Sequence, residues 1–143
     1  KMKILILNGP NLNRQGRREP EKYGTTTMEE CVAALRARYP QAEFVYRQSN
    51  CEGALIDILQ EAEDEGGYVG VVMNAGAYSH TSLAIADAIA SITTPVVEVH
   101  ITNTAARGGI RATSMIAPVC RGSIVGFGID SYRLAVEALL GNA

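Results

Sequence analysis

Residues 3–11 read KILILNGPN, a short apolar run that ends in polar and turn-forming residues. A run of this kind is too short for a buried helix and is typical of a strand that is covered on both faces of a parallel sheet. Four further runs along the chain have the same form. The five expected strands are Lys3–Asn8, Glu43–Gln48, Val69–Asn74, Val96–Ile101 and Ser123–Gly128.

Segments with the helical spacing of apolar residues alternate with these strands. Thr27 and Glu30 have the spacing of a capping box before the first helix, and Ser49 and Glu52 have the same spacing before the second. We expect the first helix to end at Pro40 and the second at Gly66-Gly67. The third helix is expected over residues 81–91, and the fourth from the N-cap Asp130 to Gly141.

This alternation predicts one α/β domain over residues 1–143. We expect a flavodoxin-like three-layer sandwich with a five-stranded parallel sheet in the order 2-1-3-4-5. In such a sheet the ligand site lies beyond the carboxyl ends of the strands. The segments that follow the first, third and fourth strands are residues 8–11, 74–80 and 100–103, and they carry amides, hydroxyls and both histidines. The sequence therefore predicts a polar site at this edge.

The composition of the 143-residue chain narrows its class. Apolar residues make up 47% and charged residues 20%, as in an ordinary globular domain. A net charge of −2 gives no basic face for nucleic acid, and the apolar runs are far shorter than a membrane span. Because no secretory leader is recognisable, we expect a soluble cytoplasmic protein without nucleic-acid or membrane partners.

Several kinds of site are disfavoured by the motifs. Three cysteines without Cys-x-x-Cys spacing favour reduced thiols over disulfides or zinc, and two histidines cannot build a multi-histidine metal site. The chain has neither a phosphate loop ending in Gly-Lys-Ser/Thr nor a Gly-x-Gly-x-x-Gly fingerprint after the first strand. Asn8 and Asn74 stand where a phosphoacceptor receiver domain needs carboxylates. A Gly-x-Ser-x-Gly nucleophile elbow is also missing.

The connection from Asn8 to Thr27 is long for a strand-to-helix loop, and long loops in compact domains are often active-site lids. Three arginines, Arg14, Arg17 and Arg18, precede Tyr23 in this loop. A guanidinium group beside a phenol favours the phenolate form, which could act as a base. The alternative is a packing tyrosine in a solvated basic loop.

Glu98 and His100 lie two residues apart on an expected strand and therefore share one face. The carboxylate could orient the imidazole, which would then serve as a general acid. A hydrogen-bonded histidine at a strand end is the alternative. Arg107 and Arg111 follow in a glycine-containing loop and would attract a carboxylate or hydroxyl-rich ligand, unless they are only solvated.

The expected third helix is apolar on all sides, which is unusual for the surface of a monomer. We expect one face to pack on the sheet and the other on a neighbouring subunit, although an alanine-rich surface helix is the alternative. Asp87 interrupts this surface seven residues after His80, which would place both on one stripe of the helix. A carboxylate there needs a partner.

Four blocks of the sequence resemble type II 3-dehydroquinate dehydratases. They are residues 8–12 (NGPNL), 16–20 (GRREP) with Tyr23-Gly24, 74–82 (NAGAYSHTS) and 98–103 (EVHITN). The blocks occur in order and span nearly the whole chain. The resemblance implies a lyase of the shikimate pathway and aromatic amino-acid biosynthesis. It would eliminate water in the anti sense from 3-dehydroquinate, through an enolate, to give 3-dehydroshikimate, with no metal and no organic cofactor.

The resemblance also implies catalytic roles. Tyr23, as phenolate beside Arg18, would take the C2 proton. Asn11 would hold a water that stabilises the enolate oxygen. His100, oriented by Glu98, would protonate the departing C1 hydroxyl.

The substrate-binding groups implied in the same way are Asn74, His80, Arg111 and the backbone N–H groups of Ile101 and Thr102. Asp87 would enter from a neighbouring subunit, which agrees with the expected subunit contact of the third helix. The family's usual assembly is a dodecamer of four trimers. Two departures from the family pattern are Ala75, where proline is common, and Gly108-Gly109, where an acidic pair is common. We expect little effect from the first and a more mobile arginine loop from the second.

Two rival hypotheses remain. A dehydratase that forms a lysine imine would have to use Lys1, Lys3 or Lys22, and none of these positions promises a desolvated amine. A non-catalytic flavodoxin-like module that binds a small anion would explain the arginines but leaves Tyr23 without a role.

Overall fold

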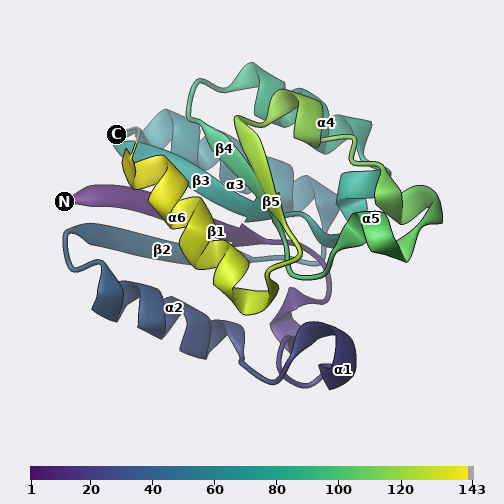
Figure 1. The fold of residues 1–143 in the computed structure, drawn as a ribbon. Helices are drawn as coiled ribbons and strands as arrows, with labels where there is room; N and C mark the ends of the chain where they lie inside the picture. The colour runs from purple at the N-terminus through teal and green to yellow at the C-terminus, as the bar shows by residue number, and fades with distance from the viewer. Residues whose placement is uncertain (142–143) are drawn as a thin grey trace.

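The computed structural model describes residues 1–141, and its sheet has the predicted order. Five parallel strands lie in the order β2-β1-β3-β4-β5 (Figure 1). Their bounds are Met2–Asn8 for β1, Ala42–Gln48 for β2, Tyr68–Asn74 for β3, Val96–His100 for β4 and Gly122–Val125 for β5.

Helices cover both faces of this sheet. The α-helices are α1 (Pro20–Tyr23), α2 (Met28–Arg38), α3 (Glu52–Glu65), α4 (Leu83–Ser91), α5 (Thr104–Arg107) and α6 (Ser131–Gly141). Short 3-10 turns span Leu12–Arg14, Gly76–His80, Gly109–Ala112, Ala117–Val119 and Gly128–Asp130. Helices α2 and α6 cover one face and α3 and α4 the other (Figure 1). Within residues 1–141, no helix has the length and hydropathy needed to cross a membrane.

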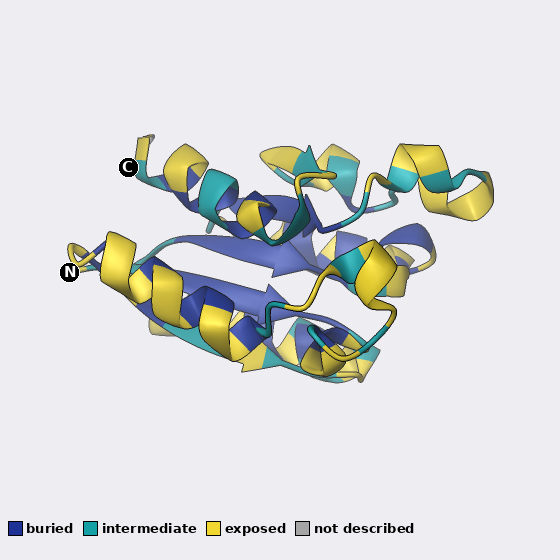
Figure 2. Ribbon diagram, turned by 60° about the horizontal axis from the view of Figure 1, so that its bottom comes forward, coloured by how far each residue is buried: buried dark blue, intermediate teal, exposed yellow. Residues whose placement is uncertain are grey.

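The apolar run of β1 divides its side chains between two cores. Ile4 and Ile6 belong to the cluster under α2 and α6, whereas Leu5 and Leu7 belong to the cluster under α3 and α4. This follows from the two-residue period of a strand, and all four residues are almost fully buried. Figure 2 shows the central strands of the sheet in the dark blue of buried residues. The sheet is thus covered on both sides, as the uninterrupted apolar run predicts.

The two predicted capping boxes have different outcomes. At α2 the Thr27 hydroxyl accepts a hydrogen bond from the Glu30 backbone N–H, and the Glu30 carboxylate accepts one from the Thr27 N–H. The box predicted from Ser49 and Glu52 is wrong. The N-cap of α3 is Cys51, and the Ser49 hydroxyl instead accepts a hydrogen bond from the Cys51 N–H at 3.0 Å. Ser49 therefore shapes the turn before the helix, a local bond that serine favours outside helices.

The last strand is shorter than predicted. β5 ends at Val125, because Gly126 has a φ of +94° and turns the chain out of the extended conformation. A 3-10 turn ends at Asp130, whose carboxylate accepts hydrogen bonds from the Arg133 guanidinium at 2.7 and 2.8 Å. Helix α6 then begins at Ser131.

The predicted helical stripe shared by His80 and Asp87 is wrong. His80 ends a 3-10 turn and is buried, whereas α4 begins only at Leu83 after the N-cap Ser82. Because the chain changes course between the two residues, helical spacing does not relate them. Asp87 is exposed on the outer face of α4, where Leu83 is 64% exposed.

Candidate active site

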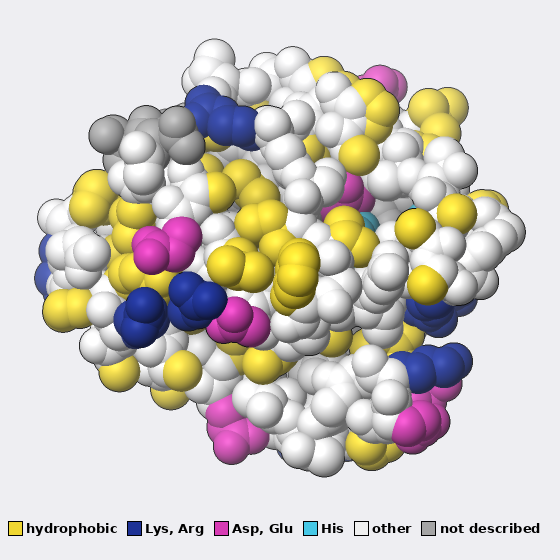
Figure 3. Space-filling model, in the orientation of Figure 1, with side chains coloured by type: hydrophobic (Ala, Val, Ile, Leu, Met, Phe, Trp, Pro, Cys, Tyr) yellow, Lys and Arg dark blue, Asp and Glu magenta, His cyan; other side chains and the backbone are white. Residues whose placement is uncertain are grey.

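A pocket lies at the carboxyl ends of β1, β3 and β4, with about 550 Å³ of empty space when the solvent at its open mouth is included. Its lining residues are Pro10, Asn11, Leu12, Arg18, Tyr23, Asn74, Gly76, Ala77, His80, His100, Ile101, Thr102, Thr104, Arg107 and Arg111. The polar edge predicted from the strand ends is therefore where the pocket lies. Figure 3 shows Lys and Arg side chains beside Asp and Glu side chains at the lower right, and further Lys and Arg side chains at the left and the upper left.

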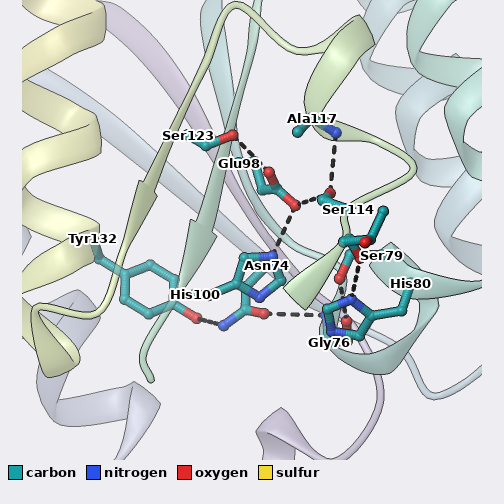
Figure 4. Close-up of polar contacts among 11 residues, drawn as sticks. Asn74, Gly76, Ser79, His80, Glu98, His100, Ser114, Ala117, Ser123 and Tyr132 are labelled. Carbon is teal, nitrogen blue, oxygen red and sulfur yellow. Dashed lines mark hydrogen bonds and ion pairs between the residues drawn. The ribbon is translucent and has the colours of Figure 1, made fainter. Parts of the chain in front are cut away.

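His100 is buried at the end of β4 and is held by Glu98. Its Nε2 lies 2.8 Å from a carboxylate oxygen of Glu98, which is only 1% exposed. The hydroxyls of Ser114 and Ser123 each donate to this carboxylate at 2.6 Å (Figure 4). The strand spacing predicted the Glu98–His100 pair, but the two serines come from later segments and were not predicted.

The hydrogen bonds decide the charge of Glu98. Burial by itself would raise the pKa of the Glu98 carboxyl, but the bonds from His100, Ser114 and Ser123 outweigh it and hold this pKa below its ordinary value. An ionised carboxylate can only accept, so His100 Nε2 carries the hydrogen of the shared bond. The other ring nitrogen, Nδ1, is left for proton exchange with a ligand.

His80 lies beside His100 in the pocket wall. The two rings stack with centroids 5.9 Å apart and an interplanar angle of 21°. The Nδ1 of His80 lies 2.7 Å from the Thr113 carbonyl oxygen, and because a carbonyl only accepts, Nδ1 is the donor. Nε2 is then the nitrogen that can meet a ligand hydroxyl.

Asn74 is held by a buried network at the end of β3. Its Oδ1 accepts a hydrogen bond from the Gly76 N–H at 3.1 Å, and its Nδ2 donates to the Tyr132 hydroxyl at 3.0 Å (Figure 4). The Tyr132 hydroxyl in turn donates to Asn8 at 2.8 Å, and burial raises the pKa of this phenol well above its ordinary value. Nδ2 carries a second hydrogen, so Asn74 can still donate to an anion in the pocket.

Tyr23 reaches the pocket from α1, in the long loop after β1. The Arg18 guanidinium carbon lies 4.0 Å from the centroid of its ring, and Arg107 donates to its hydroxyl at 3.2 Å. Within residues 1–141, Arg18 and Arg107 are the two side chains that make cation–π contacts with the Tyr23 ring. Of the three arginines predicted beside Tyr23, only Arg18 lies there. Arg107, expected only to attract a ligand, contacts the phenol from 84 residues away.

The remaining predicted residues occupy different places. Asn11 and Arg111 are exposed at the pocket, and Ile101 and Thr102 follow β4 in its wall. Asp87 does not reach the pocket of its own chain, because it lies on the outer face of α4. Among residues 1–141, no group of three His, Cys, Asp or Glu residues could hold a metal ion. The pocket combines an oriented imidazole, a phenol under two cations and several anion donors, which suits acid–base chemistry on an anionic ligand.

Comparison with known proteins is consistent across sequence and structure. The family model described as "Dehydroquinase class II" matches residues 2–140. A 3-dehydroquinate dehydratase of Pelodictyon phaeoclathratiforme is 54% identical over 140 residues, which cover 98% of this chain and 93% of the relative. The crystal structure of a type II dehydroquinase from Butyrivibrio crossotus has a TM-score of 0.93 at 44% identity and 97% coverage of both chains. One from Propionibacterium acnes has a TM-score of 0.92 at 40% identity, with 99% and 97% coverage.

Proposed function

This chain belongs to the class II dehydroquinase family and dehydrates 3-dehydroquinate in the shikimate pathway, and we propose that Tyr23 is the base and His100 the acid of an anti elimination. In this reaction Tyr23 takes a proton from C2 and leaves an enolate. The C1–O bond then breaks as the C1=C2 double bond forms. The departing hydroxyl takes a proton from His100 and leaves as water, and the product is 3-dehydroshikimate.

Two guanidinium groups support Tyr23 as the base. Arg107 donates directly to the phenol oxygen, and Arg18 lies over the ring. A guanidinium group can stabilise negative charge on a phenol oxygen, and both arginines lie within reach of the Tyr23 side chain. We therefore propose that Arg18, over the ring, and Arg107, at its oxygen, share the role that the sequence predicts for Arg18 alone.

The hydrogen bonds of Glu98 support His100 as the acid. Because Nε2 is committed to the carboxylate, Nδ1 is the atom that would donate to the leaving hydroxyl. The two serines keep Glu98 ionised and fixed, so the imidazole needs no reorientation during the reaction.

The other pocket residues would bind and stabilise the reacting molecule. In the proposal, Asn11 holds a water at the enolate oxygen, while Asn74 and the backbone N–H groups of Ile101 and Thr102 bind the carboxylate. His80 and Arg111 bind ring hydroxyls. All of these residues line the same pocket as Tyr23 and His100, which supports the assignment.

The proposal includes a homo-oligomer, a dodecamer of four trimers, in which Asp87 enters the pocket of a neighbouring subunit. The exposed Asp87 and Leu83 on the outer face of α4 support a subunit contact there. Light scattering on the purified protein measures this assembly directly. We also propose that residues 1–143 are one catalytic domain. We propose further that the enzyme is cytoplasmic, because Cys31, Cys51 and Cys120 are all free thiols, as is usual for proteins in a reducing compartment.

Neither Lys3 nor Lys22 is placed in a way that supports a lysine-imine mechanism. Lys3 pairs with Glu65 at 2.8 Å near the amino end of β1, at the opposite end of the sheet from the pocket. Lys22 is exposed and pairs with Glu19 at 3.1 Å. Borohydride added with substrate should leave the protein unmodified, and a reduced adduct would favour the imine mechanism.

One observation carries the proposal: a phenol under two cations and a carboxylate-oriented imidazole line one pocket. The test is ultraviolet detection of the conjugated enone carboxylate after 3-dehydroquinate is added to the purified protein. A chelator in the assay tests whether the reaction depends on a metal. Absorbance should rise with the wild-type protein and not with Tyr23→Phe. Equal rates for both would exclude Tyr23 as the base.

A further inference from the structure

Gln15 lies beneath the loop that carries Tyr23 and holds its backbone. Its side chain is only 2% exposed, and its Nε2 donates to the Tyr23 carbonyl at 2.6 Å and to the Thr26 carbonyl at 3.2 Å. One amide nitrogen thus ties together the residue that enters the pocket and the residue where the chain returns toward α2. Neither bond was expected from the sequence.

The orientation of the Gln15 amide is fixed by chemistry. Two carbonyl oxygens face Nε2, and reversing the amide would place an oxygen against both of them. This orientation leaves the amide oxygen unpaired, because Oε1 is buried without a hydrogen-bond partner within residues 1–141. An unpaired buried polar atom is destabilising, so an apolar side chain would fill this space at lower cost if filling were the only role. The donor end therefore explains why an amide lies here.

The neighbouring glycine brings the same two segments into contact. Gly16 has a φ of +92°, and a Cβ atom there would lie 2.9 Å from the Thr25 carbonyl oxygen and 3.0 Å from the Thr27 methyl group. Residues 15–16 and 23–27 therefore form the neck of a closed loop, which we call the lid neck. Residues 17–22 lie between the two sides of this neck, and Tyr23 is at its edge.

From this arrangement we propose that Gln15 is a positioning residue for Tyr23. The lid neck fixes the Tyr23 backbone from below, while Arg18 and Arg107 fix its ring from the pocket side. Gln15 does not touch the substrate, and it acts by keeping the phenol oxygen at the position from which it reaches C2. This inference rests on the proposed role of Tyr23 as the base.

The first test is Gln15→Met, which keeps the length and volume of the side chain and removes both hydrogen bonds. A displacement of about 1 Å in a reacting group can cost about a hundredfold in rate, so we expect kcat to fall by about tenfold to a hundredfold. KM should change much less, because the pocket groups that bind the carboxylate and hydroxyls lie outside the lid neck. Gln60→Met, the same exchange on the exposed face of α3, is the matched control and should leave kcat unchanged.

The second test, Gln15→Glu, distinguishes positioning from a loss of folding. The introduced carboxyl can donate to the Tyr23 carbonyl only when it is protonated, and it repels both carbonyls when it is ionised. The ratio of its kcat to the wild-type kcat should therefore rise as the pH is lowered. The same ratio for Gln15→Met should not change with pH.

Parallel assays of Tyr23→Phe separate this inference from the proposed function. Loss of turnover in Tyr23→Phe with unchanged kcat in Gln15→Met would overturn the role of Gln15 alone. Wild-type turnover in Tyr23→Phe would overturn the proposed function itself. A ratio for Gln15→Glu that does not vary with pH would also contradict positioning through a donated hydrogen bond.

Discussion

The acid side and the base side of the pocket are built in opposite ways. His100 belongs to a buried strand, and its partner Glu98 accepts hydrogen bonds from groups on β4, β5 and the segment before Ala117. Tyr23 ends a four-residue helix that contributes no buried residue to the core. The acid is fixed by the sheet, whereas the base lies on a loop and is held by contacts within that loop and by Arg107 of α5.

This difference has a physical consequence. A preorganised group loses little free energy in reaching the reactive geometry, whereas a group on a loop must be held there by contacts that close over the ligand. We therefore expect changes on the acid side to alter both catalysis and stability, and changes on the base side to alter catalysis alone.

The largest expected effect is that of Tyr23→Phe on the base side. Loss of a general base costs about 10² to 10⁴ in rate, so kcat should fall by that factor while KM changes little. The melting temperature should not change, because the ring is only half-buried and its oxygen bonds to a pocket arginine. Steady-state kinetics and thermal unfolding check both parts. A large fall in melting temperature would show that the two sides are not built differently.

On the acid side, Glu98→Gln should reduce both properties. An amide has one accepting oxygen, so it cannot accept from Ser114, Ser123 and His100 together as the carboxylate does. We expect kcat to fall by about a hundredfold, within the range for a disrupted general acid. Stability should fall by about 1–3 kcal/mol, the cost of unpaired buried polar groups. Unchanged stability in chemical denaturation would contradict the comparison.

A smaller effect is expected for Ser123→Ala, and it should depend on pH. Because the pKa of Glu98 is lowered in the folded protein, its ionised form adds stability above the unfolded value of about 4.3, and this is lost as pH falls through the folded value. Removing one donor brings the pKa of Glu98 back toward its ordinary value. The variant should therefore be less stable than the wild type by about 1 kcal/mol at pH 7, and the difference should shrink toward pH 3. Denaturation curves at both pH values measure this, and a difference that grows on acidification would refute it.

The smallest effect is expected far from the pocket, at Glu63 on α3. Its carboxylate accepts hydrogen bonds from the backbone and hydroxyl groups of Thr93 and Thr94, which lower the pKa of Glu63 to about 2. Glu63→Gln should lower the melting temperature slightly at pH 7, with the difference lost as pH falls toward 2. Its kcat should equal that of the wild type, and a change in kcat would mean that α3 affects the pocket.

The contrast between the two sides also explains how much the sequence could predict. The strands and the Glu98–His100 pair follow from short-range periodicity, which is a local property of the chain. The strand order follows from the alternation of strands and helices with right-handed crossovers. The contact of Arg107 with Tyr23 and the bonds from Ser114 and Ser123 to Glu98 join distant segments, so no spacing reveals them.

Tyr132 illustrates the same limit. In the sequence it is one more apolar position of the last helix, and only the packing of α6 on the sheet brings its hydroxyl to Asn74 and Asn8. The wrong prediction that His80 and Asp87 share a helical stripe arose because a helical period was applied across the turn between them.

The central claim is that a phenol and an imidazole act on opposite faces of the substrate ring. A crystal structure with a planar analogue of the enolate bound in the pocket measures this directly. The account predicts the Tyr23 oxygen at hydrogen-bond distance from the position of C2 on one face, and His100 Nδ1 toward C1 on the other. Both groups on the same face of the ring would contradict it.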